Sequence, residues 1–88
     1  MKGKPKGYCV HMDGTTTIAK LYATNIVTVK DGVVTLDTGG HNGPHTRKCM
    51  NLFVKSMGIR VFQKDWNWFL SYEDLTIPFE NDTAQIKI

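Results

Sequence analysis

The segment TNIVTVKDGVVTLDT, residues 24–38, constrains the fold more than any other part of the chain. Asp31-Gly32 separates two runs rich in β-branched residues, which is the strongest short signal for a β-hairpin. A two-residue loop fixes the cross-strand pairs as Lys30 with Val33, Val29 with Val34, Thr28 with Thr35 and Val27 with Leu36. Because side chains alternate across a strand, Val27, Val29, Val34 and Leu36 share one face, which we expect to be buried. Ile26 is apolar but falls out of phase with them.

Residues 46–57, TRKCMNLFVKSM, predict an amphipathic helix. The Thr46 hydroxyl is placed to cap its first turn, and Gly58 is placed to end it in a left-handed conformation. Three- and four-residue spacing gives a buried face made of Cys49, Met50, Phe53 and Met57. The opposite face is basic and polar, and consists of Arg47, Lys48, Asn51 and Lys55.

Strands are predicted on both sides of this helix. Residues 8–12, 15–22, 59–64 and 66–72 are rich in β-branched or aromatic residues, and alternation in the last segment places Trp66 and Trp68 on one side. Pro78 indicates an edge strand or an exit from the sheet, and a short apolar alternation ends the chain at residues 86–88. The order of elements predicts an α+β fold, a small antiparallel β-sheet with one amphipathic helix, about residues 46–57, packed on it.

The length of 88 residues fits one domain. Because Lys2, Lys4 and Lys6 alternate with Gly and Pro, we expect a flexible basic arm over residues 1–7 and a single globular domain over 8–88. No apolar run has the length of a signal peptide or a membrane span. Two cysteines are too few for a disulfide scaffold, which favours free thiols in a reducing cytoplasm.

The charges are divided unevenly along the chain. Residues 47–64 carry five basic residues and no acid, whereas residues 65–88 carry five acids and one lysine. This asymmetry indicates either an anionic partner for the middle segment or an acidic end folded back on it. Exposed tryptophans beside basic groups would stack on bases or anchor a protein interface, whereas buried ones would be core. The candidate binding surface consists of Arg47, Lys48, Asn51, Lys55, Arg60, Lys64, Trp66 and Trp68.

Residues with metal-ligating or catalytic side chains give weaker signals. Ligand types suited to tetrahedral zinc are present at Cys9, His11, His41, His45 and Cys49. The spacings match no CxxC pair and no HxxxH pair on a continuous helix, so zinc is a minor hypothesis. Gly39 and Gly40 precede a helix but form neither a Walker nor a dinucleotide-binding motif. No third group orients a thiol–histidine pair, so we expect no enzymatic activity and no cofactor.

The chain resembles a family of short proteins encoded by tailed bacteriophages over about residues 15–79. The matching residues are Thr15, Thr16, Thr17, Leu21, Tyr22, Thr35, Leu36, Thr38, Gly39, Gly40, Thr46, Arg47, Asn51, Val61, Phe62, Gln63, Trp68 and Phe69. The sequence departs from the family pattern at His41, where an aromatic residue is usual, at His45, where Thr or Ser is usual, and at Cys49, where a basic residue is usual. The resemblance implies a viral origin and a host-cytoplasmic setting, and it assigns no catalytic residue.

These observations favour a non-enzymatic phage accessory protein, acting in host takeover or against host defence. We expect it to bind and modulate a host protein complex, one that handles nucleic acid. The alternative is direct binding of nucleic acid through the basic helix face and the N-terminal arm. Both hypotheses place the protein in the bacterial host cytoplasm and away from the membrane.

Overall fold

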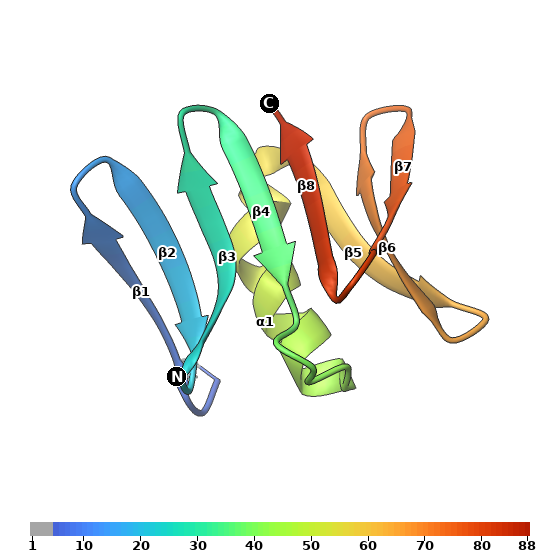
Figure 1. Ribbon diagram of the computed structural model, residues 1–88, viewed down its shortest axis with the longest axis horizontal. Helices are drawn as coiled ribbons and strands as arrows, with labels where there is room; N and C mark the ends of the chain where they lie inside the picture. The colour runs from blue at the N-terminus through green and yellow to red at the C-terminus, as the bar shows by residue number, and fades with distance from the viewer. Residues whose placement is uncertain (1–4) are drawn as a thin grey trace.

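The computed structural model describes residues 5–88 as two antiparallel sheets and one helix (Figure 1). The first sheet has the strand order β1-β2-β3-β4-β8 and the second has the order β5-β6-β7. The strands are β1 (Tyr8–Asp13), β2 (Thr16–Leu21), β3 (Thr24–Lys30), β4 (Val33–Asp37), β5 (Ile59–Lys64), β6 (Asn67–Tyr72), β7 (Leu75–Pro78) and β8 (Thr83–Lys87). The helix α1 spans Pro44–Val54 and continues as a 3-10 turn, η1, over Lys55–Met57.

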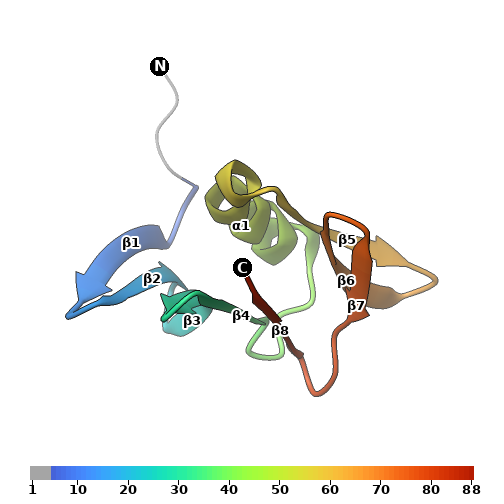
Figure 2. The same cartoon turned by 90° about the horizontal axis from the view of Figure 1, so that it is seen from above.

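Helix α1 lies on one face of the five-stranded sheet, and the three-stranded sheet stands beside the helix, next to β8 (Figure 2). The α+β fold with one packed helix is therefore confirmed, although the strands form two sheets rather than one. The chain reaches the second sheet through the helix, adds β5, β6 and β7, and returns to pair β8 with β4. The helix contacts β2 and β3 of the first sheet and β5 of the second, so it is packed against both sheets.

The central hairpin has the predicted register. Lys30 pairs with Val33, and the pairing continues in step to Val27 and Leu36. Val27, Val34 and Leu36 are completely buried, and Val29 packs against the core from a half-buried position. Ile26 is also fully buried, because a β-bulge pairs Ala19 with Val27 but Lys20 with Asn25 and leaves Ile26 unpaired. A bulge locally breaks the alternation of faces, so Ile26 joins the core that the sequence pattern alone excluded it from.

The helix begins two residues earlier than predicted. Pro44 is in its first turn, where the fixed φ of proline suits a helix start. Gly43 is the N-cap residue and no side chain caps the helix, so the predicted capping role of Thr46 is wrong. Thr46 is instead buried inside the first turn. Gly58 ends the 3-10 turn with a φ of 78°, as predicted.

The core lies between the helix and the two sheets. Cys49 and Met50 are fully buried and Phe53 and Met57 pack around them, as the helical spacing predicted. Val61, Trp68 and Leu70 complete the core from the second sheet. Pro78 ends β7 at the edge of that sheet, which confirms its predicted position.

The predicted division into an arm and a domain stays a prediction, because residues 1–4 lie outside the described part of the chain. From Pro5 onward the backbone makes a turn in which the Tyr8 N–H donates to the Pro5 carbonyl at 3.1 Å. The Tyr22 N–H then donates to the Gly7 carbonyl at 2.7 Å. Residues 5–7 are therefore hydrogen-bonded to the β1–β2 hairpin.

Candidate functional site: a basic groove and an apolar cavity

The larger candidate site is an open, polar groove where α1 meets β5 and the β5–β6 turn. We call it the Trp66 groove. It is lined by Arg47, Asn51, Arg60, Val61, Phe62, Gln63, Asp65 and Trp66. Four residues of the predicted binding surface are thus brought together here, namely Arg47, Asn51, Arg60 and Trp66.

Asn51 holds the helix against the strand at the base of this groove. Its Nδ2 donates to the Val61 carbonyl at 2.8 Å, and its Oδ1 accepts from the Val61 N–H at 2.8 Å. Because β5 is an edge strand, these backbone groups point away from β6 and need another partner. Asn51 is therefore half-buried and bonded to the second sheet, which packs on a side of the helix that a single sheet would leave free, while it still lines the groove.

The two arginines are held in the groove by polar and aromatic contacts. An Arg47 Nη1–H donates to Gln63 Oε1 at 3.0 Å, and the Arg47 guanidinium carbon lies 5.3 Å from the centroid of the Trp68 ring. The Arg60 guanidinium carbon lies 5.4 Å from the centroid of the Phe62 ring. These separations are within the range of cation–π attraction. The guanidinium groups are thereby ordered before any partner arrives, which lowers the entropy cost of binding.

Trp66 projects from the tip of the β5–β6 hairpin with 90% of its surface exposed. Asp65 and Trp66 form the two-residue turn and have φ values of 52° and 69°. Positive φ at both central residues favours Asn-Gly or Asp-Gly, and a bulky side chain there is strained. Among residues 5–88, seven non-glycine residues have positive φ; five are Asp, Asn or Glu, and the two aromatic ones are Tyr22 and Trp66.

Trp68 does not share the environment of Trp66. It lies in β6, only 6% exposed, and its ring packs edge-on against Phe79 with the centroids 5.7 Å apart. The prediction that both tryptophans lie on one side of a strand is wrong, because Trp66 belongs to the turn and not to the strand. Trp68 is therefore a core residue beneath Arg47, and it is not part of the candidate binding surface.

The other predicted basic residues, Lys48, Lys55 and Lys64, are exposed but do not line the groove. On its other side Trp66 borders a second, smaller depression, which Asn81 and Asp82 line together with Trp68 and Phe79. The exposed indole therefore stands between a basic surface with Arg47 and Arg60 and an acidic one with Asp82.

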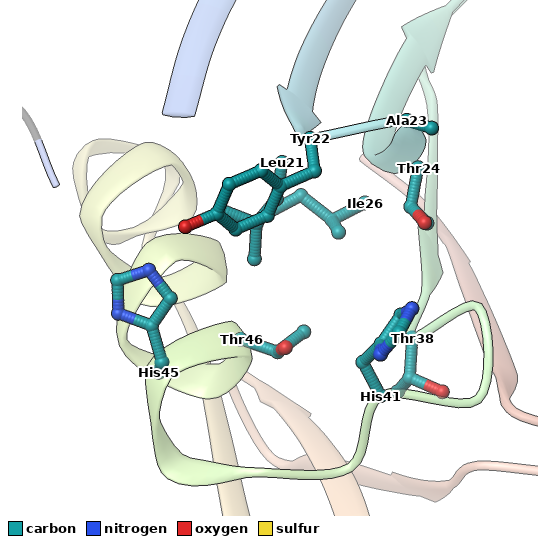
Figure 3. A pocket seen from close by; sticks show the side chains of 9 residues that line it. All are labelled: Leu21, Tyr22, Ala23, Thr24, Ile26, Thr38, His41, His45 and Thr46. Atoms are coloured by element: carbon teal, nitrogen blue, oxygen red, sulfur yellow. The ribbon is translucent and has the colours of Figure 1, made fainter. Parts of the chain in front are cut away.

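A second candidate site lies beside the first turn of α1. It is a cavity of about 340 Å³ between the β2–β3 turn, the β4–α1 loop and the first turn of α1. We call it the histidine cavity. Its lining residues are Leu21, Tyr22, Ala23, Thr24, Ile26, Thr38, His41, His45 and Thr46. In Figure 3, Tyr22 and His45 stand on one side, His41 and Thr38 face them from the other, and Thr46 lies between.

Both sides of the histidine cavity are fixed by close contacts. The Tyr22 ring covers Gly7 so closely that a Cβ on Gly7 would lie 2.6 Å from Tyr22 Cε1 and Cζ. On the other side, Gly39 packs against Thr24, and a Cβ on Gly39 would lie 2.6 Å from Thr24 Cγ2. The His41 N–H donates to the Thr38 carbonyl at 3.0 Å. Close packing at the turns therefore shapes both walls of the cavity.

The five predicted metal ligands are not brought together. Cys9 and His11 are exposed on β1, and Cys49 is completely buried in the core. His45 Nε2 lies 3.9 Å from Cys49 Sγ and 3.2 Å from the Lys6 carbonyl oxygen, while His41 lines the other wall of the cavity. Within residues 5–88, no three His, Cys, Asp or Glu side chains form a group able to hold a metal ion. Burial raises the pKa of the Cys49 thiol, which disfavours the thiolate that binds metals.

Sequence reasoning identified His41 and His45 but not their neighbours. Leu21, Tyr22 and Ile26 are far from them in sequence, and only the bulge at Ile26 and the strained turn at Tyr22 place them in the cavity. Gln63 and Asp65 in the groove were likewise missed. Their signal was weak, since a Gln on a strand and an Asp in a turn are ordinary surface residues.

Comparison with known proteins assigns the chain to a family. No curated protein and no solved structure shows significant similarity to it. Among residues 5–88, no helix has the length and apolar character needed to cross a membrane. The family model described as Kyanoviridae Gp96 protein matches residues 6–86, nearly the whole chain, which confirms the resemblance to phage-encoded proteins. The chain belongs to the Kyanoviridae Gp96 protein family, a family of cyanophage proteins.

Proposed function

We propose that the chain is a non-enzymatic accessory protein of the phage that binds a host protein complex through the Trp66 groove and modulates that complex in the host cytoplasm. The observation that carries the proposal is Trp66 itself. A tryptophan that is 90% exposed, at a turn position where φ is 69°, is unfavourable for folding alone. Exposed tryptophan and arginine are the residue types that dominate binding energy at protein interfaces.

The charges around Trp66 favour a protein partner over nucleic acid. Arg47 and Arg60 lie on one side of the indole, but Asp65 lines the same groove and Asp82 lines the adjoining depression. A polyanion would be repelled by the two carboxylates, whereas a protein surface can present both charge signs in a matching pattern. The side of the groove that carries Arg47 and Arg60 suits an acidic patch on the partner protein.

A comparison of capture by wild-type and variant proteins tests this proposal. The tagged protein is incubated with lysate of a cyanobacterial host, and captured proteins are quantified against Trp66→Gly and Trp66→Ala. The captured complex is then purified and titrated with each variant. We expect the affinity of both Trp66 variants to fall by about thirtyfold, the effect of losing a binding hot spot. Leu75→Thr, which removes an exposed apolar side chain from β7, is the matched control and should bind as the wild type does.

Equal affinity of wild type and both Trp66 variants for the captured complex would contradict the proposal. Direct nucleic-acid binding remains the second candidate because Lys48 in α1, Lys55 in η1 and Lys64 in β5 are exposed. Titration with random single- and double-stranded oligonucleotides over a salt series addresses it. Binding at low salt that Lys48→Ala and Lys55→Ala abolish would favour the second candidate, since phosphate contacts depend on salt.

A further inference from the structure

The histidine cavity is separate from the Trp66 groove and takes no part in the function proposed above. Its volume of about 340 Å³ is within the range of small-molecule sites. Its floor is apolar, made by Leu21 and Ile26, and its lining contains no Lys, Arg, Asp or Glu. The part of a ligand that is buried in such a lining should therefore carry no charge.

The walls of the cavity are aromatic. The Tyr22 phenol ring and the His45 imidazole stand on one side, and the His41 imidazole stands on the other (Figure 3). Tyr22 adopts a φ of 54°, a strained conformation for an aromatic residue. Its backbone and ring are both held in place, by the hydrogen bond to the Gly7 carbonyl and by the contact with Gly7. Facing aromatic rings favour a flat aromatic guest.

A threonine hydroxyl adds a polar group to this lining. Thr46 is only 4% exposed, and it lines the cavity. In Figure 3 the Thr46 side chain points into the space between Tyr22 and His41. A hydroxyl can both donate and accept a hydrogen bond, so Thr46 offers a polar contact to a ligand in the cavity. The Thr24 hydroxyl and the His41 ring supply further hydrogen-bonding groups at the rim.

We propose that the histidine cavity binds a nucleobase, stacked between Tyr22 and His41 and hydrogen-bonded along its edge by Thr46. An aromatic side chain of a partner protein would offer at most one polar group, as in Tyr or Trp. A nucleobase offers several donors and acceptors on its edge, which matches the hydroxyls of Thr24 and Thr46 and the imidazole of His41. The sugar of a nucleoside would remain at the open mouth.

Titration of ¹⁵N-labelled protein followed by NMR tests the proposal. Adenosine, guanosine, cytidine and uridine are compared with p-cresol, indole and the non-aromatic cyclohexanol. We expect saturable shifts of the amides of Leu21, Tyr22 and Ile26 with at least one nucleoside, and weaker shifts with cyclohexanol. Thr46→Val, which keeps the side-chain shape, should weaken nucleoside binding about fivefold, as the loss of one hydrogen bond does. Thr76→Val on the exposed strand β7 is the matched control and should leave the binding unchanged.

Several results would overturn the assignment. These are the absence of saturable shifts with every nucleoside at millimolar concentration, equal binding of cyclohexanol, and binding of p-cresol or indole without any nucleoside. Unchanged nucleoside affinity in Thr46→Val would also overturn it. Trp66→Gly should retain full nucleoside binding, so failure of this proposal and failure of the partner-binding proposal are distinguished by separate variants.

Discussion

The Asn51 side chain forms two hydrogen bonds of 2.8 Å with the backbone of Val61, one to the N–H and one to the carbonyl. This pair of bonds joins the single helix to the exposed edge of the second sheet. The Trp66 groove lies directly over it, because Asn51 and Val61 both line the groove. The same contact therefore stabilises the fold and positions Arg47 on the helix and Arg60 on β5 at the groove.

Replacing Asn51 should destabilise the protein more than a substitution at a surface helix residue usually does. Asn51→Ala leaves two backbone groups of Val61 without partners, and we expect the free energy of unfolding to fall by about 2 kcal/mol. Urea denaturation followed by circular dichroism measures the loss. Asn42→Ala, at an exposed loop residue, is the control and should change stability by less than about 0.5 kcal/mol. Equal effects of the two substitutions would show that the Asn51 bonds do not hold helix and sheet together.

Trp66→Gly should stabilise the protein while it removes partner binding. Glycine adopts the φ of 69° at this position without strain, and the variant turn would have the same Asp-Gly sequence as the favoured turn at Asp31-Gly32. We expect a gain of about 1 kcal/mol in the free energy of unfolding. Trp66→Ala removes the indole but keeps a Cβ in the left-handed conformation, so it should give no such gain. Thermal denaturation of the two variants side by side provides the measurement, and a destabilised Trp66→Gly would refute the strain argument.

The contact between Gly7 and Tyr22 should be visible as an energetic coupling. Gly7→Ala introduces a Cβ at a φ of 81° and against the Tyr22 ring, and we expect a loss of about 2 kcal/mol. In a Tyr22→Ala background the clash is absent and the loss should shrink to about 1 kcal/mol. Gly14→Ala is the control, since Gly14 has a φ of 64° but no atom within 4 Å of an added Cβ. A Gly7→Ala effect that does not depend on residue 22 would count against the observed packing.

Stability should decline at alkaline pH because two buried acids must keep their protons in the folded state. Burial raises the pKa of the Cys49 thiol above its ordinary value of 9.0, and the positive charge of Lys48 opposes part of the shift. Burial, reinforced by the Cys49 and Cys9 thiols, raises the pKa of Tyr8 above 10.0. Above the unfolded pKa the unfolded state releases protons that the folded state retains, so the free energy of unfolding falls as pH rises through the folded pKa.

We therefore expect full stability below about pH 9 and a progressive loss above it. Cys49→Ala should be less stable at pH 7, because it leaves a small cavity, but its stability should change less between pH 8 and pH 10. Cys9→Ser, at an exposed thiol, should retain most of the wild-type decline, because Cys9 is the smallest of the causes that raise the pKa of Tyr8. Urea denaturation over this pH range gives the curves, and a wild-type curve that rises with pH would contradict the assignment.

The sequence predicted the local structure well. The Asp31-Gly32 turn and the β-branched runs around it determine the register of β3 and β4, because turn geometry and side-chain alternation act between neighbouring residues. The spacing of Cys49, Met50, Phe53 and Met57 likewise determined which side of the helix faces the core. These features depend on interactions between residues within one hairpin or a few helical turns. Such residues are close in the sequence, so the sequence pattern alone predicts them.

The tertiary structure decided where the surface is. A bulge opposite Ala19 and Lys20 turned Ile26 into the core. The second sheet bonded to Asn51, and Trp68, a residue of that sheet, was buried against Phe79 and beneath Arg47. The helix and strand patterns had placed both residues on a binding surface. Trp66 was left at a strained turn, and the same long-range packing brought Tyr22 to Gly7 and His45. Exposure and cavity shape depend on which distant elements pack together, so the periodicity of one segment determines its buried face only when a single neighbour covers it.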